Sequence, residues 1–300
     1  MATKVAVIIV TYNGLQWIDK CIGLLRNSSL PLTPIVVDNC STDGTTSYIE
    51  NNYPEVMLIK SNINLGFGKG NNLGIEKGLA LDYDYFFLLN QDAWIESNTV
   101  EELVVANRNN PQYGILSPMH LNGVGSSLDS LFSRYLSSYN IPEIISDLYL
   151  SKLQPVYTTN FINAAAWLVS RKCLETVGLF DPIFPHYGED EDYAHRTLSL
   201  GYKIGLVTTV KIFHDRDNRE PLNISLNLQR SYIKNVLNIK NLNGKFLANL
   251  VFVLKSEIDQ LFTYLIFRRI KEAKVKGKVI YKTISNLRPI HKSYLLNKGK

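Results

Sequence analysis

The chain has 300 residues, of which 45% are hydrophobic and 20% charged, with 18 Gly and 11 Pro. This composition excludes a disordered chain, a collagen-like protein and a small disulfide scaffold, and it predicts a folded globular protein. The cysteines Cys21, Cys40 and Cys173 are widely spaced and form no C-x-x-C pair. The spacing favours a reducing compartment over a disulfide framework or a zinc cluster.

The net charge of +5 is distributed unevenly. Residues 255–300 contain twelve basic and three acidic residues, a local charge of +9, whereas residues 1–254 carry −4. The basic segment interleaves Phe, Leu, Ile and Tyr with Lys and Arg, a pattern typical of an amphipathic helix on anionic lipid or of a nucleic-acid-binding surface. A helical face that is simply solvated explains the pattern equally well.

No segment has the pattern of a signal peptide or a membrane span. The first apolar run, Val5–Val10, is shorter than a signal sequence requires. The most apolar later stretch, Phe246–Phe267, carries Lys255, Glu257 and Asp259 near its middle, where a bilayer would penalise each charge. We therefore expect a cytoplasmic protein.

Over the first 120 residues, apolar runs typical of strands alternate with stretches of helical periodicity. Short strands that are each followed by a helix predict a parallel sheet covered on both faces. We expect strands at Val5–Thr11, Ile35–Asp38, Val56–Lys60, Tyr85–Leu89 and Ile115–Ser117, and helices at Gln16–Leu25, Thr45–Asn51, Asn71–Leu79 and Thr99–Asn107.

The rhythm changes after residue 120. Residues 120–160 are rich in Ser, Tyr and Leu and predict a long excursion over the strand ends, of the kind that shapes substrate pockets. The chain is expected to return at Phe161–Ser170, to form a helix up to Leu200, and then to form strands at Ile204–Val207 and Lys211–His214. Everything from Leu222 onward has helical character.

Polar residues follow the expected strands at Thr11–Asn13, Asp38–Asn39, Ser61–Asn62 and Asn90–Asp92. Ligands of such sheets bind at the carboxyl ends of the strands, so these positions predict a ligand site. Asp38 is placed there to accept hydrogen bonds from a base or a ribose, although a strand-end carboxylate can also satisfy nearby turn amides.

The glycine-rich stretch at 64–72 precedes an expected helix. Its backbone N–H groups are candidates for binding phosphate, but close packing of a helix on the sheet explains the glycines equally well. The stretch contains neither the P-loop nor the dinucleotide-binding fingerprint.

Two further positions have acidic chemistry. Asp92 follows the apolar strand 85–89 and is a candidate ligand for Mg²⁺ or Mn²⁺, with a turn role as the alternative. The run Glu189–Asp192 opens a helix, where acids favour the macrodipole. It has more carboxylates than capping needs, and crowding raises carboxylate basicity, which suits a general base. His214 ends a late strand and is a weaker candidate metal ligand.

Five motifs occur in an order and spacing that resemble family 2 inverting glycosyltransferases, especially the bacterial rhamnosyltransferase-like branch. They are residues 7–13, 36–45, 64–72, 88–93 and 188–192. The resemblance implies an α/β GT-A fold, with a mostly parallel sheet flanked by helices. It also implies a nucleoside-diphosphate sugar donor of the UDP or dTDP type, an acceptor hydroxyl and a divalent cation, Mg²⁺ or Mn²⁺.

The same resemblance implies roles for individual residues. Asp190 corresponds to the catalytic base, with Glu189 and Asp192 on the acceptor side of the acidic cluster, while Asp92 and His214 correspond to metal ligands. The first acid of the family's D-x-D element is replaced by Asn90, which leaves fewer charged metal ligands. The expected donor-binding residues are Thr11, Tyr12, Asn13, Asp38, Asn64, Gly66, Lys69, Asn71, Asn90 and Gln91.

These observations predict an enzyme that moves a sugar to an acceptor hydroxyl by in-line displacement in bacterial surface polysaccharide synthesis. We expect a catalytic domain at 1–221, with a nucleotide-sugar half at 1–118 and an acceptor and catalytic half at 119–221. A basic helical extension at 222–300 is expected to touch the inner face of the plasma membrane. The partners are then a glycan or lipid-linked acceptor and no nucleic acid. A sugar-1-phosphate nucleotidyltransferase and a non-catalytic sugar-nucleotide-binding protein are the alternatives.

Overall fold

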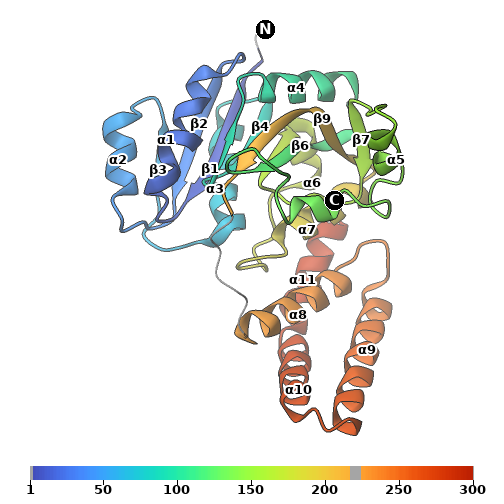
Figure 1. The fold of residues 1–300 in the computed structure, drawn as a ribbon. Helices are drawn as coiled ribbons and strands as arrows, with labels where there is room; N and C mark the ends of the chain where they lie inside the picture. The colour runs from blue at the N-terminus through green and yellow to red at the C-terminus, as the bar shows by residue number, and fades with distance from the viewer. Residues whose placement is uncertain (1–2, 217–223, 300) are drawn as a thin grey trace.

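A nine-stranded mixed sheet forms the centre of the molecule in this computed structural model, which describes residues 3–216 and 224–299 (Figure 1). The strand order is β3-β2-β1-β4-β8-β6-β9-β5, and β7 pairs with β9. The strands are β1 Val5–Thr11, β2 Leu32–Asp38, β3 Met57–Lys60, β4 Tyr85–Asn90, β5 Ala93–Ile95, β6 Tyr113–Asn122, β7 Val156–Thr159, β8 Ala166–Ser170 and β9 Lys203–His214.

Most strands of the sheet point the same way. β1 to β4 are mutually parallel, and β6 and β9 follow the same direction, whereas β5, β7 and β8 run against their neighbours. The carboxyl ends of β1, β2 and β4 are in register, with Thr11 opposite Asp38 and Val10 opposite Asn90. The expected mostly parallel GT-A sheet is confirmed.

Helices cover both faces of the sheet (Figure 1). Side chains of β1 alternate between two buried clusters: Val5, Val7 and Ile9 join α1, α2 and α4, while Ala6 and Ile8 join α3, α6 and α7. The helices are α1 Ile18–Cys21, α2 Thr45–Asn52, α3 Gly66–Ala80, α4 Thr99–Asn109, α5 Ile144–Tyr149, α6 Arg171–Val177, α7 Glu189–Ser199, α8 Ile224–Ile239, α9 Phe246–Ile266, α10 Ile270–Ser285 and α11 Leu287–Lys298.

Helix α3 starts earlier than expected and runs through the glycine-rich stretch. Gly70, Gly74 and Gly78 recur every fourth residue and face the sheet, where an added Cβ would lie 2.6–2.8 Å from side chains of Val10, Ile8 and Phe86, respectively. No side chain fits at such distances without displacing the helix. These three glycines therefore serve close helix–sheet packing, the alternative to phosphate binding that the sequence left open.

Other elements differ from expectation in extent. The helix expected at Gln16–Leu25 is broken into α1 and two 3-10 turns. The two late strands belong to one strand, β9, whose pairing with β6 is interrupted between Val207 and Lys211. β5 and β7 were not expected. The boundary expected at residue 221 lies outside the described residues, and β6 runs without a break through the division expected at residue 118.

The C-terminal helices share a core with the segment that precedes α7. Phe184, in the segment before α7, packs with Val236 of α8, Val253 of α9 and Ile290 of α11. Among the described residues, no helix combines the length and the apolar character needed to cross a membrane.

Candidate active site

A cavity of about 750 Å³ lies at the carboxyl ends of β1, β2 and β4, a volume that suits a nucleotide sugar. The N-terminus of α3 and the segment 185–190 form its other walls. The lining residues are Val10, Tyr12, Asn39, Ile63–Phe67, Lys69, Asn90–Asp92, Asn163–Ala165, Pro185–Tyr187, Glu189, Asp190 and Arg216. Of the expected donor-binding residues, the cavity contains Tyr12, Asn64, Gly66, Lys69, Asn90 and Gln91.

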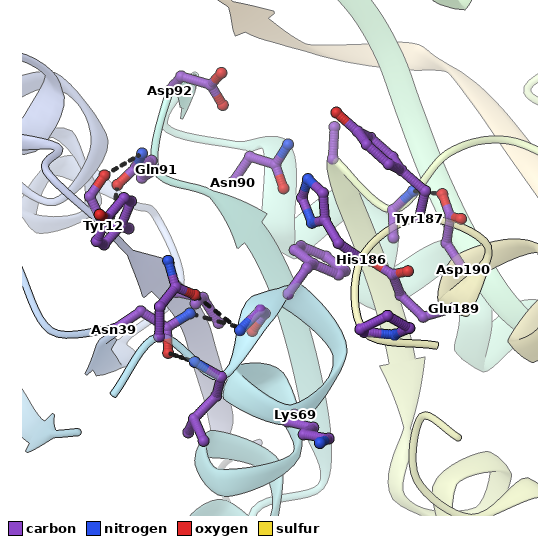
Figure 2. A pocket seen from close by; sticks show the side chains of 18 of the residues that line it. Tyr12, Asn39, Lys69, Asn90, Gln91, Asp92, His186, Tyr187, Glu189 and Asp190 are labelled. Carbon is purple, nitrogen blue, oxygen red and sulfur yellow. Dashed lines mark hydrogen bonds between the residues drawn. The ribbon is translucent and has the colours of Figure 1, made fainter. Parts of the chain in front are cut away.

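Gln91 connects the ends of β4 and β1. Its Oε1 accepts hydrogen bonds of 2.8 Å from the Thr11 hydroxyl and from the Tyr12 backbone N–H, and its Nε2 donates to the Tyr12 carbonyl (Figure 2). Thr11 is fully buried and lies behind the pocket wall. Its position indicates that it orients Gln91 and supports Tyr12, which is 47% exposed and lines the cavity.

Asn39 holds the glycine-rich loop against the end of β2. Its Nδ2 donates to the Gly66 carbonyl at 3.1 Å, and its Oδ1 accepts from the Leu65 N–H at 3.3 Å. Gly66 also packs on the Pro185 carbonyl, where an added Cβ would lie at 2.3 Å. Sequence reasoning placed Asn39 at a strand end but gave it no role.

Asp38 and Asn13 lie beside the cavity and are not among its lining residues. Asp38 Oδ2 accepts from the Ser41 N–H at 3.0 Å, while its buried Oδ1 has no hydrogen-bond partner within the described residues. The Asn13 side chain accepts from the Thr42 N–H. Asn71, also expected to bind donor, is buried and donates to the Phe67 carbonyl within α3.

Two adjacent carboxylates, Glu189 and Asp190, enter the cavity from the first turn of α7, across from the β4 end (Figure 2). Asp190 is partly exposed, and its oxygens accept from the N–H groups of Glu191 at 2.9 Å and Ala164 at 3.4 Å. Burial raises the pKa of Asp190, although these amides oppose the shift.

Glu189 is more deeply buried than its neighbour, with 4% exposure. Burial, assisted by the charge of Asp190, raises the pKa of Glu189 from an ordinary 4.5 to about 8. At neutral pH, Glu189 is therefore mostly protonated and can donate a hydrogen bond, whereas Asp190 is the better placed base.

Asp192 does not reach the cavity with Glu189 and Asp190. Its carboxylate is 2.9 Å from Arg196 Nε and 2.7 Å from Nζ of Lys240, the residue that follows α8. Lys240 also pairs with Asp181. The structure thus places Asp192 in a buried ion network rather than on an acceptor surface.

Asp92 and His214 lie in direct contact at the edge of the cavity. His214 Nε2 is 3.2 Å from Asp92 Oδ1, and its Nδ1 is 3.4 Å from Asp129 Oδ2. All three side chains are nearly inaccessible to solvent, but Asp92 lines the cavity. Asp129, which no sequence signal indicated, is positioned to hold the His214 ring in one orientation.

The side chains available here as metal ligands suit a cation only in part. Among residues 3–216 and 224–299, no group of three or more His, Cys, Asp or Glu side chains is arranged to hold a metal ion. Mg²⁺ commonly takes one or two protein carboxylates and completes its coordination with substrate phosphates and waters. Asp92 and His214 fit a cation that is shared with a diphosphate.

Comparison with known proteins agrees with this architecture. Residues 6–177, more than half of the chain, match the model of glycosyl transferase family 2. The N-acetylglucosaminyl-diphospho-decaprenol L-rhamnosyltransferase of Mycobacterium tuberculosis is 24% identical over 244 residues, which cover 72% of this chain and 77% of the relative. The low-salt glycan biosynthesis hexosyltransferase Agl10 of Haloferax volcanii is also 24% identical, over 72% of this chain and 68% of its own length.

Solved structures share the fold at low identity. TarS residues 1–349 of S. aureus, in complex with UDP-GlcNAc, superimpose with a TM-score of 0.60 and 15% identity over 99% of this chain and 89% of that one. The structure of GalNAc-T7 with UDP, GalNAc and Mn²⁺ superimposes with a TM-score of 0.57 and 13% identity. The match covers 84% of this chain and 54% of that one. A longer TarS structure is covered over only 41% of its length. The chain belongs to glycosyl transferase family 2 and is a glycosyltransferase with a GT-A fold.

Proposed function

We propose that this enzyme is an inverting hexosyltransferase that uses a UDP or dTDP sugar and acts on a lipid-linked glycan acceptor. The observation that carries the proposal is the position of Asp190, a partly exposed carboxylate of raised pKa that shares one cavity with the strand-end residues Tyr12 and Asn90–Asp92. One base facing one donor site is what a single displacement requires.

In the proposed reaction, the donor diphosphate lies toward Asn90 and Asp92 and the acceptor hydroxyl lies near Asp190. Asp190 removes the hydroxyl proton while the acceptor oxygen attacks the anomeric carbon. The bond from that carbon to the diphosphate breaks on the opposite face, and the nucleoside diphosphate leaves with the bonding electrons. A single displacement of this kind inverts the anomeric configuration.

Three neighbouring groups support this chemistry. Asp92 and His214 are the residues that would hold Mg²⁺ or Mn²⁺, which offsets negative charge on the leaving group when it is bound. Lys69, at the N-terminal end of α3, lines the cavity and adds positive charge to the same region. Glu189, when protonated, can donate a hydrogen bond to donor or acceptor oxygens.

The acceptor and the cellular location rest on two supports. The mycobacterial relative is named for transfer to N-acetylglucosaminyl-diphospho-decaprenol, a lipid-linked sugar, and residues 255–300 of this chain carry a charge of +9. We therefore place the enzyme at the inner face of the plasma membrane, in synthesis of a surface polysaccharide.

The test is incubation of the purified enzyme with a panel of UDP and dTDP sugars and a lipid-linked acceptor, with Mn²⁺ or with EDTA. We expect transfer from one donor class, loss of transfer in EDTA, and an anomeric configuration in the product, read by NMR, opposite to that of the donor. Retention of configuration would refute the single displacement, and full activity in EDTA would refute the metal assignment.

A further inference from the structure

The outer half of the α9–α10 hairpin has no packed core. Buried residues of α9 end at Glu257, those of α10 begin at Ala273, and none of residues 258–272 between them is buried. We call residues 258–272 the hairpin tip. It points away from the sheet and forms the far end of the molecule (Figure 1).

The hairpin tip is nevertheless rich in large apolar side chains. Phe262 is 58% exposed, Leu265 46%, Ile266 74%, Phe267 72% and Ile270 51%. Single exposed apolar residues are normal, but large apolar side chains gathered in one exposed segment mark an interaction site.

Basic residues follow this apolar group along the chain. Arg268 and Arg269 directly follow it, and Lys271, Lys274 and Lys278 continue along α10. The cores of protein–protein interfaces are depleted in Lys, whereas Lys and Arg beside exposed Phe and Leu are typical of a helix lying in a membrane interface. The chemistry therefore favours anionic lipid over a second protein surface.

The base of the hairpin is fixed to the catalytic part. Lys240, directly after α8, pairs with Asp181 and Asp192, and Ser293 and Asn297 of α11 donate to the same Asp181 carboxylate. Next to the tip, α9 and α10 are joined by the buried ion pair of Lys276 Nζ and Glu257 Oε1, 3.0 Å apart. The hairpin tip therefore projects from a base that is fixed by buried ion pairs and hydrogen bonds.

We propose that the hairpin tip inserts its apolar side chains into the interface of an anionic phospholipid membrane while its basic residues contact the headgroups. α8, at the base of the hairpin, packs Ile233 against Gly188, immediately before the carboxylates of α7. Membrane attachment through the tip therefore sets the position of the catalytic cavity relative to the bilayer. This inference deepens the proposed function, but membrane binding requires neither donor nor turnover.

The experiment is co-sedimentation of the full chain with vesicles, without any sugar donor. We expect binding to vesicles of phosphatidylglycerol and phosphatidylcholine that weakens with salt, and little binding to phosphatidylcholine alone. The triple variant Phe262→Ser, Ile266→Ser, Phe267→Ser should lower the partition coefficient about tenfold or more. The variant Arg268→Gln, Lys271→Gln, Lys274→Gln should lower the preference for phosphatidylglycerol.

A matched control removes exposed apolar groups elsewhere. Ile145, Leu148 and Tyr149 of α5 are 52%, 59% and 88% exposed, and their replacement by Ser should leave vesicle binding unchanged. Thermal unfolding of every variant checks folding. The proposal is wrong if the wild type does not bind anionic vesicles, or if the tip and α5 variants lose binding equally. It is also wrong if sedimentation velocity shows that the tip residues hold a dimer together.

Discussion

Glu189 and Asp190 are adjacent carboxylates with different environments, and the difference assigns their chemistry. Asp190 is partly exposed and receives two backbone N–H groups, which stabilise its ionised form. Glu189 is 4% exposed, and its Oε2 has no hydrogen-bond partner within the described residues. The same cavity therefore holds the proposed base, Asp190, and, at neutral pH, a neutral acid, Glu189.

Neutral isosteres separate the two roles. Asp190→Asn should lower kcat by about 10²-fold or more, because the acceptor hydroxyl loses its base. Glu189→Gln, which imitates the protonated acid, should keep kcat within about tenfold of wild type. The measurement is the steady-state rate of each variant, with sugar-donor binding as the control. A large loss of kcat in Glu189→Gln and a small loss in Asp190→Asn would assign the base to Glu189. In wild type, kcat/KM should fall as the pH falls through the raised pKa of Asp190.

The raised pKa of Glu189 also predicts how stability depends on pH. Between about pH 4.5 and about pH 8 the folded chain holds a proton on Glu189 that the unfolded chain releases, so stability falls as the pH rises across this window. Each unit of pKa shift corresponds to about 1.4 kcal/mol. Glu189→Gln should match wild type below about pH 4.5 and exceed its stability by a few kcal/mol above about pH 8.

Urea unfolding of both proteins across this pH range is the measurement. The difference in unfolding free energy between variant and wild type should grow with pH and then level off. Parallel stability curves would show that Glu189 is ionised in the folded protein.

Sequence reasoning found residues with polar side chains at strand ends, but not the residues that hold them. Tyr12, Gln91, Asp92 and Asp190 follow from motifs that are local in the chain. Asn39 contacts a loop 26 residues away, and Asp129 reaches His214 from a segment without a motif. Such contacts depend on the fold, which local patterns do not encode.

At the scale of elements, α7 is held in place by Lys240, the residue that follows α8. Lys240 is 1% exposed at its side chain and lies between Asp181 and Asp192, the latter on the same helix as Asp190. Burial acts to raise the pKa of Asp181, but the charge of Lys240 and the hydrogen bonds of Asp181 lower it to about 2. The network depends on the cation between two buried carboxylates.

Removal of that cation should be costly. Lys240→Met should lower the free energy of unfolding by about 3–5 kcal/mol, because buried carboxylates lose their partner. Lys172→Met, at an exposed position of α6, is the matched control and should change stability by less than about 0.5 kcal/mol. The double variant Lys240→Met, Asp181→Asn should be less destabilised than the sum of the single variants, measured by urea unfolding. An additive result would show that the pair contributes nothing.

The elements with a clear hydrophobic period were predicted well, and those defined by contacts were not. β1 matches its expected range, and α2 and α4 differ only at their C-terminal ends. The start of α3 was missed because glycine is a poor helix former, whereas its packing on β1 needs glycine. β5 has three residues, and it forms by pairing with β9, so its local sequence carries too weak a signal.

For the whole molecule, the sequence predicted the class of fold and the presence of C-terminal helices. It did not predict which of these helices pack into the core and which part projects beyond it. The helical extension at 222–300 was expected as one basic unit of the chain that touches the membrane. In the structure, α8 and α11 belong to the core of the catalytic part, while the hairpin tip lies beyond it. The two portions should therefore respond differently to deletion.

Truncation after Lys245 removes α9 to α11, and with them Val253 and Ile290 of the shared core and two hydrogen-bond donors to Asp181. Loss of several kcal/mol on this scale should lower Tm by about 10 °C or more. Replacing residues 258–275 by a short Gly-Ser linker retains Glu257 and Lys276, whose side chains meet at 3.0 Å. That chain should unfold within a few degrees of wild type, since Ala273 is the one buried residue of the excised segment. Thermal unfolding monitored by circular dichroism compares the truncated chain with the linker variant. An equal loss of Tm in these two proteins would show that the hairpin tip is part of the folded core.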